Sequence, residues 1–300
     1  MAEGPAPVFV DTDIGDDIDD ALALALVLNS PEVELRGVSV VFGDVATRAR
    51  LALKLLAAYG RSDVPVAIGR AAPLLGPPPD SSPNQAVVLE EGEELPRPQA
   101  CTADELILGT AAQTDGELTV ITIGAMTNMA LALLRDPGLA RRARLVVMGG
   151  AVGWQQAEWN VRCDPEAARI CFESGISLAM VGLDVTLKCQ MSQGDVGQLA
   201  NAGSEATALL ARMTEAWART GDGQGKRTPV LHDPLAVAVA WRPELVAWEP
   251  KCVRVETRGE FTRGFTVPVA GEPNAQVAVG VEAEAFLRLF MDRLLRPAGC

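Results

Sequence analysis

Residues 8–28 read VFVDTDIGDDIDDALALALVL, and this stretch decides how the chain folds. It opens with three apolar residues, continues with six aspartates within ten positions, and ends in an apolar run. The pattern predicts a short buried strand, a loop, and a buried helix that starts at Asp19 and ends near Asn29. The segment Asp11–Asp20 is called the acidic loop below.

Downstream of the acidic loop, apolar strands alternate with helices. We expect strands at Leu35–Phe42, Val64–Ile68, Leu118–Ile123, Leu145–Met148 and Ser177–Val181, and helices at Ala46–Tyr59, Ala103–Gln113, Met126–Leu134 and Pro165–Glu173. This alternation predicts an α/β fold, namely an open, doubly wound, mostly parallel sheet flanked by helices.

The last third of the chain has a different pattern. It predicts helices at Ser204–Thr220 and Pro234–Trp241, strands of a smaller sheet at Lys251–Glu256, Phe265–Val269 and Gln276–Val279, and a closing amphipathic helix at Glu282–Leu295. We expect this additional C-terminal region to belong to one domain that spans residues 1–300.

Composition excludes several classes of partner. The net charge of −13 argues against nucleic acid and against anionic membranes, because both require basic patches. No basic start precedes an apolar stretch, and no apolar run is long enough to span a bilayer, so we expect a cytoplasmic protein. The six cysteines form no Cys-x-x-Cys pair and only one histidine is present, which predicts reduced thiols and no zinc site.

Two segments are predicted to be loops. Gly76–Gln99 is rich in proline and carries an acidic run, and its length indicates either a lid or a mobile excursion. Thr220–Arg227 is rich in glycine, but it does not follow a strand and lacks the spacing of a phosphate-binding loop.

The acidic loop carries the strongest chemical signal. Like charges so close together repel one another unless a cation is present, and the flanking segments form core rather than a solvated surface. The loop is expected at the carboxyl end of a strand, where open α/β sheets bind ligands. Carboxylates without thiols suit a hard ion such as Ca²⁺ or Mg²⁺. For Asp19 and Asp20 alone, a place in the first helical turn would be a sufficient structural explanation.

Four further motifs are unremarkable one by one. Gly124-Ala-Met-Thr-Asn128 follows the strand that ends at Ile123, and Met148-Gly-Gly closes another strand. Glu158-Trp-Asn160 precedes Cys163-Asp-Pro-Glu-Ala, and His232-Asp233-Pro-Leu-Ala opens a helix. Each has a simple structural reading as a turn, a helix cap or a packed histidine.

Together and in this order, these motifs and the acidic loop resemble the inosine/uridine-preferring nucleoside hydrolase family. The resemblance extends from Val8 to about Leu295. It implies a calcium-dependent enzyme that hydrolyses the N-glycosidic bond of ribonucleosides to ribose and free base, and that forms a homodimer or homotetramer.

The resemblance also implies a role for individual residues. Asp13 would act as general base on a calcium-bound water, and His232 would protonate or hydrogen-bond the leaving base. The implied calcium ligands are Asp13, Asp20, Asp233 and the backbone carbonyl of Ile123. The implied substrate-binding residues are Asp19, Asp44, Asn128, Met148, Glu158 and Asn160, with Asp19 on the ribose 2′- and 3′-hydroxyls. A carboxylate-rich pocket suits the oxocarbenium charge that develops on the sugar.

The sequence departs from the family pattern in three places. The acidic loop is two residues longer than the common form, which leaves open whether Asp16 or Asp17 takes the role given to Asp19. Asp44 stands where the family usually has asparagine. The segment after Pro73 lacks a histidine-glycine stretch often seen there, so the sequence does not indicate which base is preferred.

Two other functions were weighed. A haloacid-dehalogenase-like phosphatase also uses Asp-x-Asp with Mg²⁺, but a glycine-threonine pair usually follows it, and here Ile14 and Gly15 follow. A non-catalytic, metal-dependent nucleoside-binding protein would not need Asp13 and His232.

Overall fold

The acidic loop connects a strand and a helix in the computed structural model, which describes residues 4–220 and 227–296. Strand β1 (Ala6–Thr12) precedes it and helix α1 (Asp19–Leu28) follows it. Val8 and Val10 belong to one hydrophobic cluster, whereas Phe9 between them belongs to a second. Because successive side chains of a strand point to opposite faces, β1 is buried on both sides.

The strands and helices expected from the sequence are present. The other strands are β2 (Val33–Val40), β3 (Val66–Ile68), β4 (Leu118–Thr122), β5 (Ala143–Met148), β6 (Ser177–Val181), β7 (Val246–Val255), β8 (Thr266–Val269) and β9 (Ala275–Val281). The other α-helices of the described residues are α2 (Val45–Ala58), α3 (Ala103–Gln113), α4 (Thr127–Arg135), α5 (Trp159–Cys163), α6 (Pro165–Glu173), α7 (Leu183–Thr186), α8 (Gln193–Ala200), α9 (Glu205–Ala218), α10 (His232–Ala238) and α11 (Ala283–Leu294). Short 3₁₀ helices lie at Asn84–Val88, Pro137–Arg141 and Pro243–Leu245.

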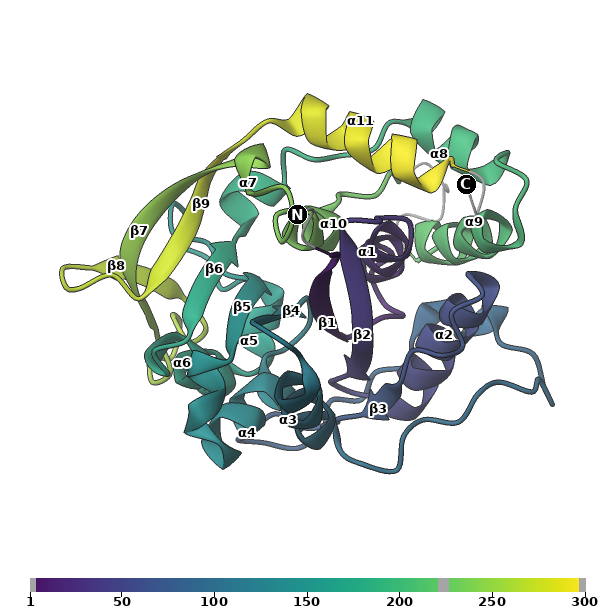
Figure 1. The fold of residues 1–300 in the computed structure, drawn as a ribbon. Coiled ribbons are helices and arrows are strands. Elements are labelled where there is room, and N and C mark those ends of the chain that lie inside the picture. Colours follow the sequence, from purple (N-terminus) through teal and green to yellow (C-terminus); the bar gives the residue numbers. More distant parts are fainter. Residues whose placement is uncertain (1–3, 221–226, 297–300) are drawn as a thin grey trace.

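The strands form one sheet in the order β3-β2-β1-β4-β5-β6-β9-β7-β8 (Figure 1). Neighbouring strands from β3 to β9 run parallel, and β7 is antiparallel to both β9 and β8. The predicted mostly parallel α/β fold is therefore confirmed. The strand order changes direction between β1 and β4, and such a switch point opens a crevice at the carboxyl ends of the strands.

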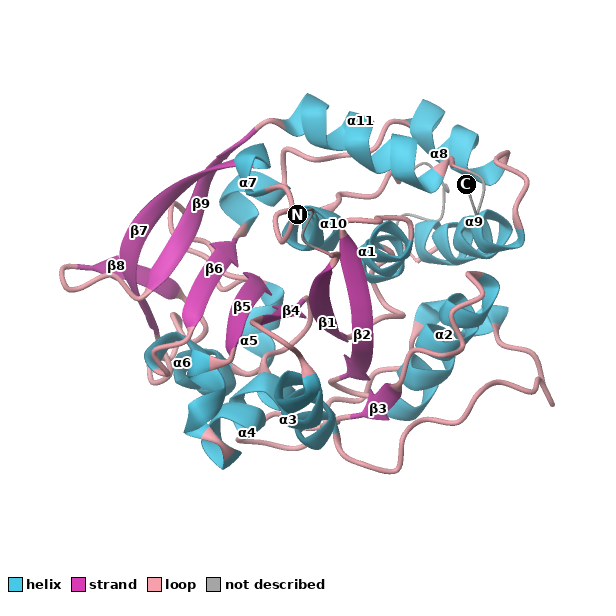
Figure 2. Cartoon of the chain, in the orientation of Figure 1, coloured by secondary structure: helices cyan, strands magenta, loops and turns pink. Residues whose placement is uncertain are grey.

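Helices cover both faces of the sheet (Figure 2). One hydrophobic cluster contains side chains of α1, α2, α9, α10 and α11, such as Leu24, Leu235 and Phe286. The other contains side chains of α3, α4 and α6, such as Ile107 and Phe172. This arrangement agrees with the predicted doubly wound architecture.

The C-terminal region differs from the expectation in how its strands are connected. The three predicted strands are present, but β9 pairs with β6 and thus extends the main sheet instead of building a separate small one. Strand β7 also begins earlier than predicted, at Val246 instead of Lys251, and it includes Pro250 near the edge of the sheet, where proline is tolerated. The sequence did not predict α5, α7 and α8, which are too short to show a helical period.

Other expectations concern the whole chain. The described cysteines, Cys101, Cys163, Cys171, Cys189 and Cys252, are free thiols. No helix of the described residues has both the length and the hydrophobicity needed to cross a bilayer. Residues 221–226 of the glycine-rich segment lie outside the described residues. A single domain over residues 1–300 stays a prediction.

Candidate active site

A cavity of about 630 Å³ lies at the carboxyl ends of the strands. It is large enough for a small organic ligand. Of the residues singled out from the sequence, those that line it are Asp13, Asp16, Asp17, Asp19, Asp20, Ile123, Met148, Glu158, Asn160, His232 and Asp233. The fold therefore gathers residues from the whole length of the chain at the predicted place.

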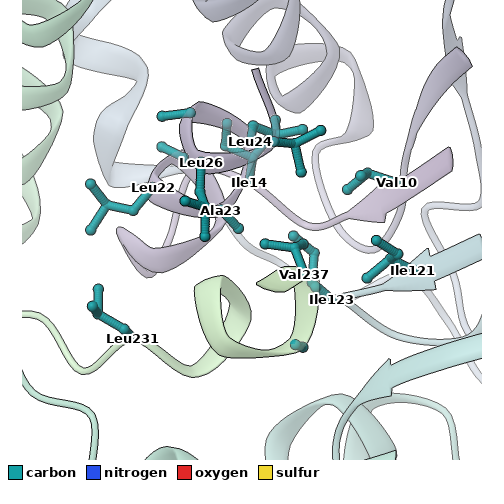
Figure 3. Packing of buried hydrophobic residues seen from close by; sticks show 14 of the residues in the cluster. Val10, Ile14, Leu22, Ala23, Leu24, Leu26, Ile121, Ile123, Leu231 and Val237 are labelled. Carbon is teal, nitrogen blue, oxygen red and sulfur yellow. The ribbon is translucent and has the colours of Figure 1, made fainter. Parts of the chain in front are cut away.

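The amino-terminal ends of α1 and α10 meet in this cavity. The two helices pack along their apolar sides, and Figure 3 shows Ala23 of α1 and Val237 of α10 in that packing. Their first turns carry Asp19, Asp20 and Asp233, whose carboxylate oxygens lie within 4.8 Å of one another. The carboxylate of Asp19 also accepts a hydrogen bond of 3.2 Å from the backbone N–H of Asp233. We call these three residues the carboxylate cluster.

The three carboxylates of the cluster repel one another, and burial disfavours their charged form. Burial raises the pKa of Asp19, Asp20 and Asp233 well above the usual range, and repulsion from neighbouring aspartates raises each further. Within residues 4–220 and 227–296, no basic side chain forms an ion pair with any of the three. Oxygen ligands and mutually repelling charges are what a hard divalent cation requires, so the cluster fits a metal ion.

Asp13 approaches the end of β4. The N–H of Ile123 donates to the carbonyl of Asp11 at 2.8 Å, which places β1 and β4 in register at the switch point. A Cβ on Gly124 would lie only 2.8 Å from Oδ1 of Asp13, so this approach requires glycine. Burial raises the pKa of Asp13 to about 6, although the nearby charge of Arg48 lowers it.

Two aspartates in the middle of the acidic loop, Asp16 and Asp17, lie beside arginines. The fully buried guanidinium of Arg48 lies 2.6 Å from the carboxylate of Asp16 and donates to the carbonyls of Asp13, Ile14 and Phe42. Near Asp17, the guanidinium of Arg227 lies 3.9 Å from the carboxylate.

Glu158 and Asn160 form a second polar group in the cavity. The carboxylate of Glu158 accepts from the N–H groups of Gly150, Asn160 and Val161 at 2.8–3.1 Å. Burial nevertheless raises its pKa to about 7. The side-chain amide of Asn160 donates to the carbonyls of Ile123 and Met148, at 2.9 and 3.1 Å. This amide thereby links the ends of β4 and β5.

Two residues assigned to the substrate do not line the cavity. The carboxylate of Asp44 caps α2 by accepting from the N–H of Thr47. The amide of Asn128 is fully buried and donates to the carboxylate of Asp11 at 2.8 Å. These contacts hold both side chains, and their assignment to the substrate stays a prediction.

His232 is the first residue of α10, and its ring also faces a buried hydroxyl. Nδ1 lies 2.8 Å from Oγ1 of Thr186, the last residue of α7. Burial lowers the pKa of His232 to about 4. The ring is therefore neutral near pH 7.

Sequence reasoning missed part of the cavity wall. The additional lining residues are Ser81, Ser82, Gln156, Trp159, Leu183, Trp217, Thr220 and Arg227. Ser81 and Ser82 come from the predicted loop Gly76–Gln99, which also packs on the acidic loop through hydrogen bonds from Asn84 and Gln85. The length of that loop was the one available signal that it contributes to the site.

Comparison with known proteins supports the same interpretation. The sequence profile described as inosine-uridine preferring nucleoside hydrolase matches residues 8–288. The pyrimidine-specific ribonucleoside hydrolase RihA of Citrobacter koseri is 36% identical, over 96% of this chain and 97% of the relative.

Solved structures share the fold over almost their full length. A plant nucleoside hydrolase, PpNRh1, superposes with a TM-score of 0.87 at 27% identity, covering 98% of this chain and 100% of that one. A purine-preferring ribonucleoside hydrolase from Gardnerella vaginalis superposes with a TM-score of 0.84 at 31% identity, covering 96% and 98%. These matches leave the haloacid-dehalogenase-like alternative without support. The chain belongs to the inosine-uridine preferring nucleoside hydrolase family.

Proposed function

We propose that this protein hydrolyses the N-glycosidic bond of ribonucleosides in the cavity, releasing ribose and the free base. The observation that carries the proposal is the carboxylate cluster, which is buried, forms no ion pair among the described residues, and is part of the same cavity as Asp13 and Glu158. Such a site stabilises the positive charge that develops on the sugar when the bond to the base breaks.

We infer that the metal is Ca²⁺ and that its ligands are Asp13, Asp20, Asp233 and the carbonyl of Ile123. Hard oxygen donors support this choice. The carbonyl of Ile123 already accepts from Asn160, but a carbonyl has two lone pairs and can serve both. A divalent cation there would make a water molecule more acidic.

Asp13 takes the role of general base. Water adds to the anomeric carbon, one of its protons passes to the carboxylate of Asp13, and the electron pair of the carbon–nitrogen bond leaves with the base, which takes up a proton from solvent to become the free base. The guanidinium of Arg48 holds the backbone carbonyl of Asp13 from behind, and Gly124 leaves room for its carboxylate. A base fixed in this way has little freedom to lose before the reaction.

The remaining residues bind the two halves of the substrate. Asp19, Glu158 and Asn160, with Met148 beside them, are assigned to the sugar. Asp19 is favoured over Asp16 and Asp17 for the ribose hydroxyls, because those two lie by arginines. His232 is assigned to the base as a hydrogen-bond donor. A ring with a pKa of about 4 is not protonated near neutral pH, so it can donate only through its single N–H.

A preference for pyrimidine ribonucleosides is the more specific part of this proposal. It rests on the 36% identity with the pyrimidine-specific RihA of Citrobacter koseri. The purine-preferring relative from Gardnerella vaginalis, at 31% identity, makes the opposite preference the natural alternative.

A panel of nucleosides tests the proposed function. Purified protein is incubated with uridine, cytidine, inosine and adenosine, with calcium or with a chelator, and free ribose is measured. We expect ribose release that requires calcium and is faster with the pyrimidine nucleosides. The same assay compares Asp13→Asn with a matched control variant, Asp63→Asn. Asp63 is an exposed aspartate that pairs with Arg61. Binding of nucleoside without release of ribose would show a non-catalytic binding protein instead.

Assembly and location stay predictions. The family resemblance implies a homodimer or homotetramer, which sedimentation velocity would distinguish from a monomer. The expected cytoplasmic location would be checked by fractionating cells of the source organism.

A further inference from the structure

Thr186 and His232 form an isolated hydrogen-bonded pair. Thr186 is fully buried, and its Oγ1 lies 2.8 Å from Nδ1 of the imidazole. The two residues are 46 positions apart and meet because α7 follows β6 while α10 begins beside it. His232 lines the cavity, and Nε2 is the ring nitrogen that Thr186 does not contact.

The direction of this hydrogen bond follows from what the hydroxyl can reach. A threonine hydroxyl has one hydrogen to donate and two lone pairs to accept with. Among the described residues, Nδ1 of His232 is the one hydrogen-bond partner of the Thr186 hydroxyl. If Nδ1 carried a proton and donated it, the hydroxyl hydrogen would be buried without an acceptor, which is costly. If the hydroxyl donates, both groups are satisfied.

Nδ1 is therefore the acceptor, and an imidazole whose Nδ1 is unprotonated carries its single proton on Nε2. The alternative tautomer would present a lone pair to the cavity. The two tautomers have opposite effects on a departing base, whose ring nitrogens and carbonyl oxygens gain negative charge as the bond breaks. Of the two tautomers, only the one with a proton on Nε2 can donate a hydrogen bond to that negative charge.

We propose that Thr186 is a positioning residue that fixes His232 as the Nε2–H tautomer and so makes the imidazole a hydrogen-bond donor to the departing base. This inference rests on the proposed role of His232 in the cavity. Thr186 itself touches neither base nor sugar; it acts through the imidazole.

The chain permits a direct test, because His232 is its only histidine. In ¹⁵N-labelled protein made without a histidine tag, long-range proton–nitrogen spectra show the two nitrogens of one imidazole with no assignment problem. At pH 7 we expect a protonated Nε2 and an unprotonated Nδ1, retained in Thr186→Ser and lost or mixed in Thr186→Val. A protonated Nδ1 in the unaltered protein would overturn the proposal, whatever the enzyme's activity.

Kinetics supply the second readout. On a nucleoside, Thr186→Val should lower kcat about tenfold, the value of one hydrogen bond, while Thr186→Ser stays near the unaltered rate. On p-nitrophenyl riboside, whose leaving group needs no such donor, both variants should be nearly normal. Equal losses on both substrates in Thr186→Val would also overturn the proposal. If the unaltered protein shows the Nε2–H tautomer but cleaves no nucleoside, the proposed function fails and the positioning by Thr186 stands.

Discussion

Two pairs of aspartates in the acidic loop differ in what faces their carboxylates. In the first pair, Asp16 lies 2.6 Å from the guanidinium of Arg48, and Asp17 lies 3.9 Å from that of Arg227. In the second pair, Asp19 and Asp20 converge with Asp233 without an ion pair among the described residues. All five aspartates line the same cavity.

The difference separates acids that shape the loop from acids that bind a ligand. The buried guanidinium of Arg48 compensates the charge of Asp16 and also binds the backbone carbonyls of Asp13 and Ile14. The pairing at Asp17 is the weaker of the two, since burial still raises its pKa despite the N–H of Ile18 and the charge of Arg227. Among the described residues, the carboxylate cluster forms no ion pair with an arginine, which is the arrangement expected where a cation is supplied from solution.

The largest expected effect concerns Asp13, the proposed general base. Asp13→Asn keeps the size of the side chain and removes the proton acceptor, so turnover of a nucleoside should fall by at least about 10²-fold. In Asp16→Asn, the control variant within the same loop, turnover should fall much less. Steady-state kinetics at saturating calcium compare the two. Similar losses in both variants would remove the distinction between base and loop support.

A smaller but still large effect is expected for Asp233. Loss of a residue that only supports a metal ligand weakens metal binding by roughly 10–100-fold. Asp233→Asn removes a proposed ligand itself, so calcium binding should weaken by at least this much. Asp17→Asn should change the affinity by no more than a few fold. Isothermal titration calorimetry on metal-free protein measures both. Equal affinities for the two variants would show that Asp233 is not a ligand.

The third effect concerns stability against pH without metal. The pKa of Asp13 is raised to about 6 in the folded protein, so between about pH 4 and 6 the folded state holds a proton that the unfolded state has lost. Stability should therefore fall as pH rises, by about 1.4 kcal/mol per pH unit for each group that titrates this way. The pKa values of the carboxylate cluster are raised further, so the decline in stability should continue to higher pH.

Calcium should remove most of that decline, because it binds the deprotonated carboxylates. Urea unfolding at several pH values, with chelator and with calcium, gives the free energy of unfolding. Stability in chelator that stays level or increases from pH 5 to 7 would contradict the view that burial disfavours the charged form of the cluster.

The smallest effect is expected for the ion pair between the half-exposed Asp16 and the buried Arg48. Asp16→Asn should lower the free energy of unfolding by less than about 1 kcal/mol, since Arg48 keeps its three carbonyl partners and water can replace the lost carboxylate. Thermal unfolding in saturating calcium measures this difference. A loss of several kcal/mol would mean that the ion pair, and not the backbone contacts of Arg48, holds the loop.

The parts of the site that were predictable are those carried by local patterns. An apolar strand followed by aspartates and an apolar helix placed the acidic loop correctly, and the order of the downstream motifs brought Ile123 and Asp233 to it. Asp44 and Asn128 were assigned by motif alone, and their side chains turned out to serve a helix cap and a buried hydrogen bond.

The other features depend on tertiary packing that no local pattern encodes. Arg48 lies within the helix α2, where the sequence gives no sign that a guanidinium will be fully buried. Trp217 and Ser81 reach the cavity wall from elements distant in sequence, and the contact between Thr186 and His232 requires α7 and α10 to meet.

The most direct test of the difference between the pair Asp16 and Asp17 and the pair Asp19 and Asp20 is a crystal structure at saturating calcium. We predict one cation with oxygens of Asp20 and Asp233 at about 2.3–2.6 Å, together with Asp13 and the carbonyl of Ile123, while Asp16 stays on its arginine. A cation held by Asp16 instead, or a carboxylate cluster without any cation at saturating calcium, would contradict the account.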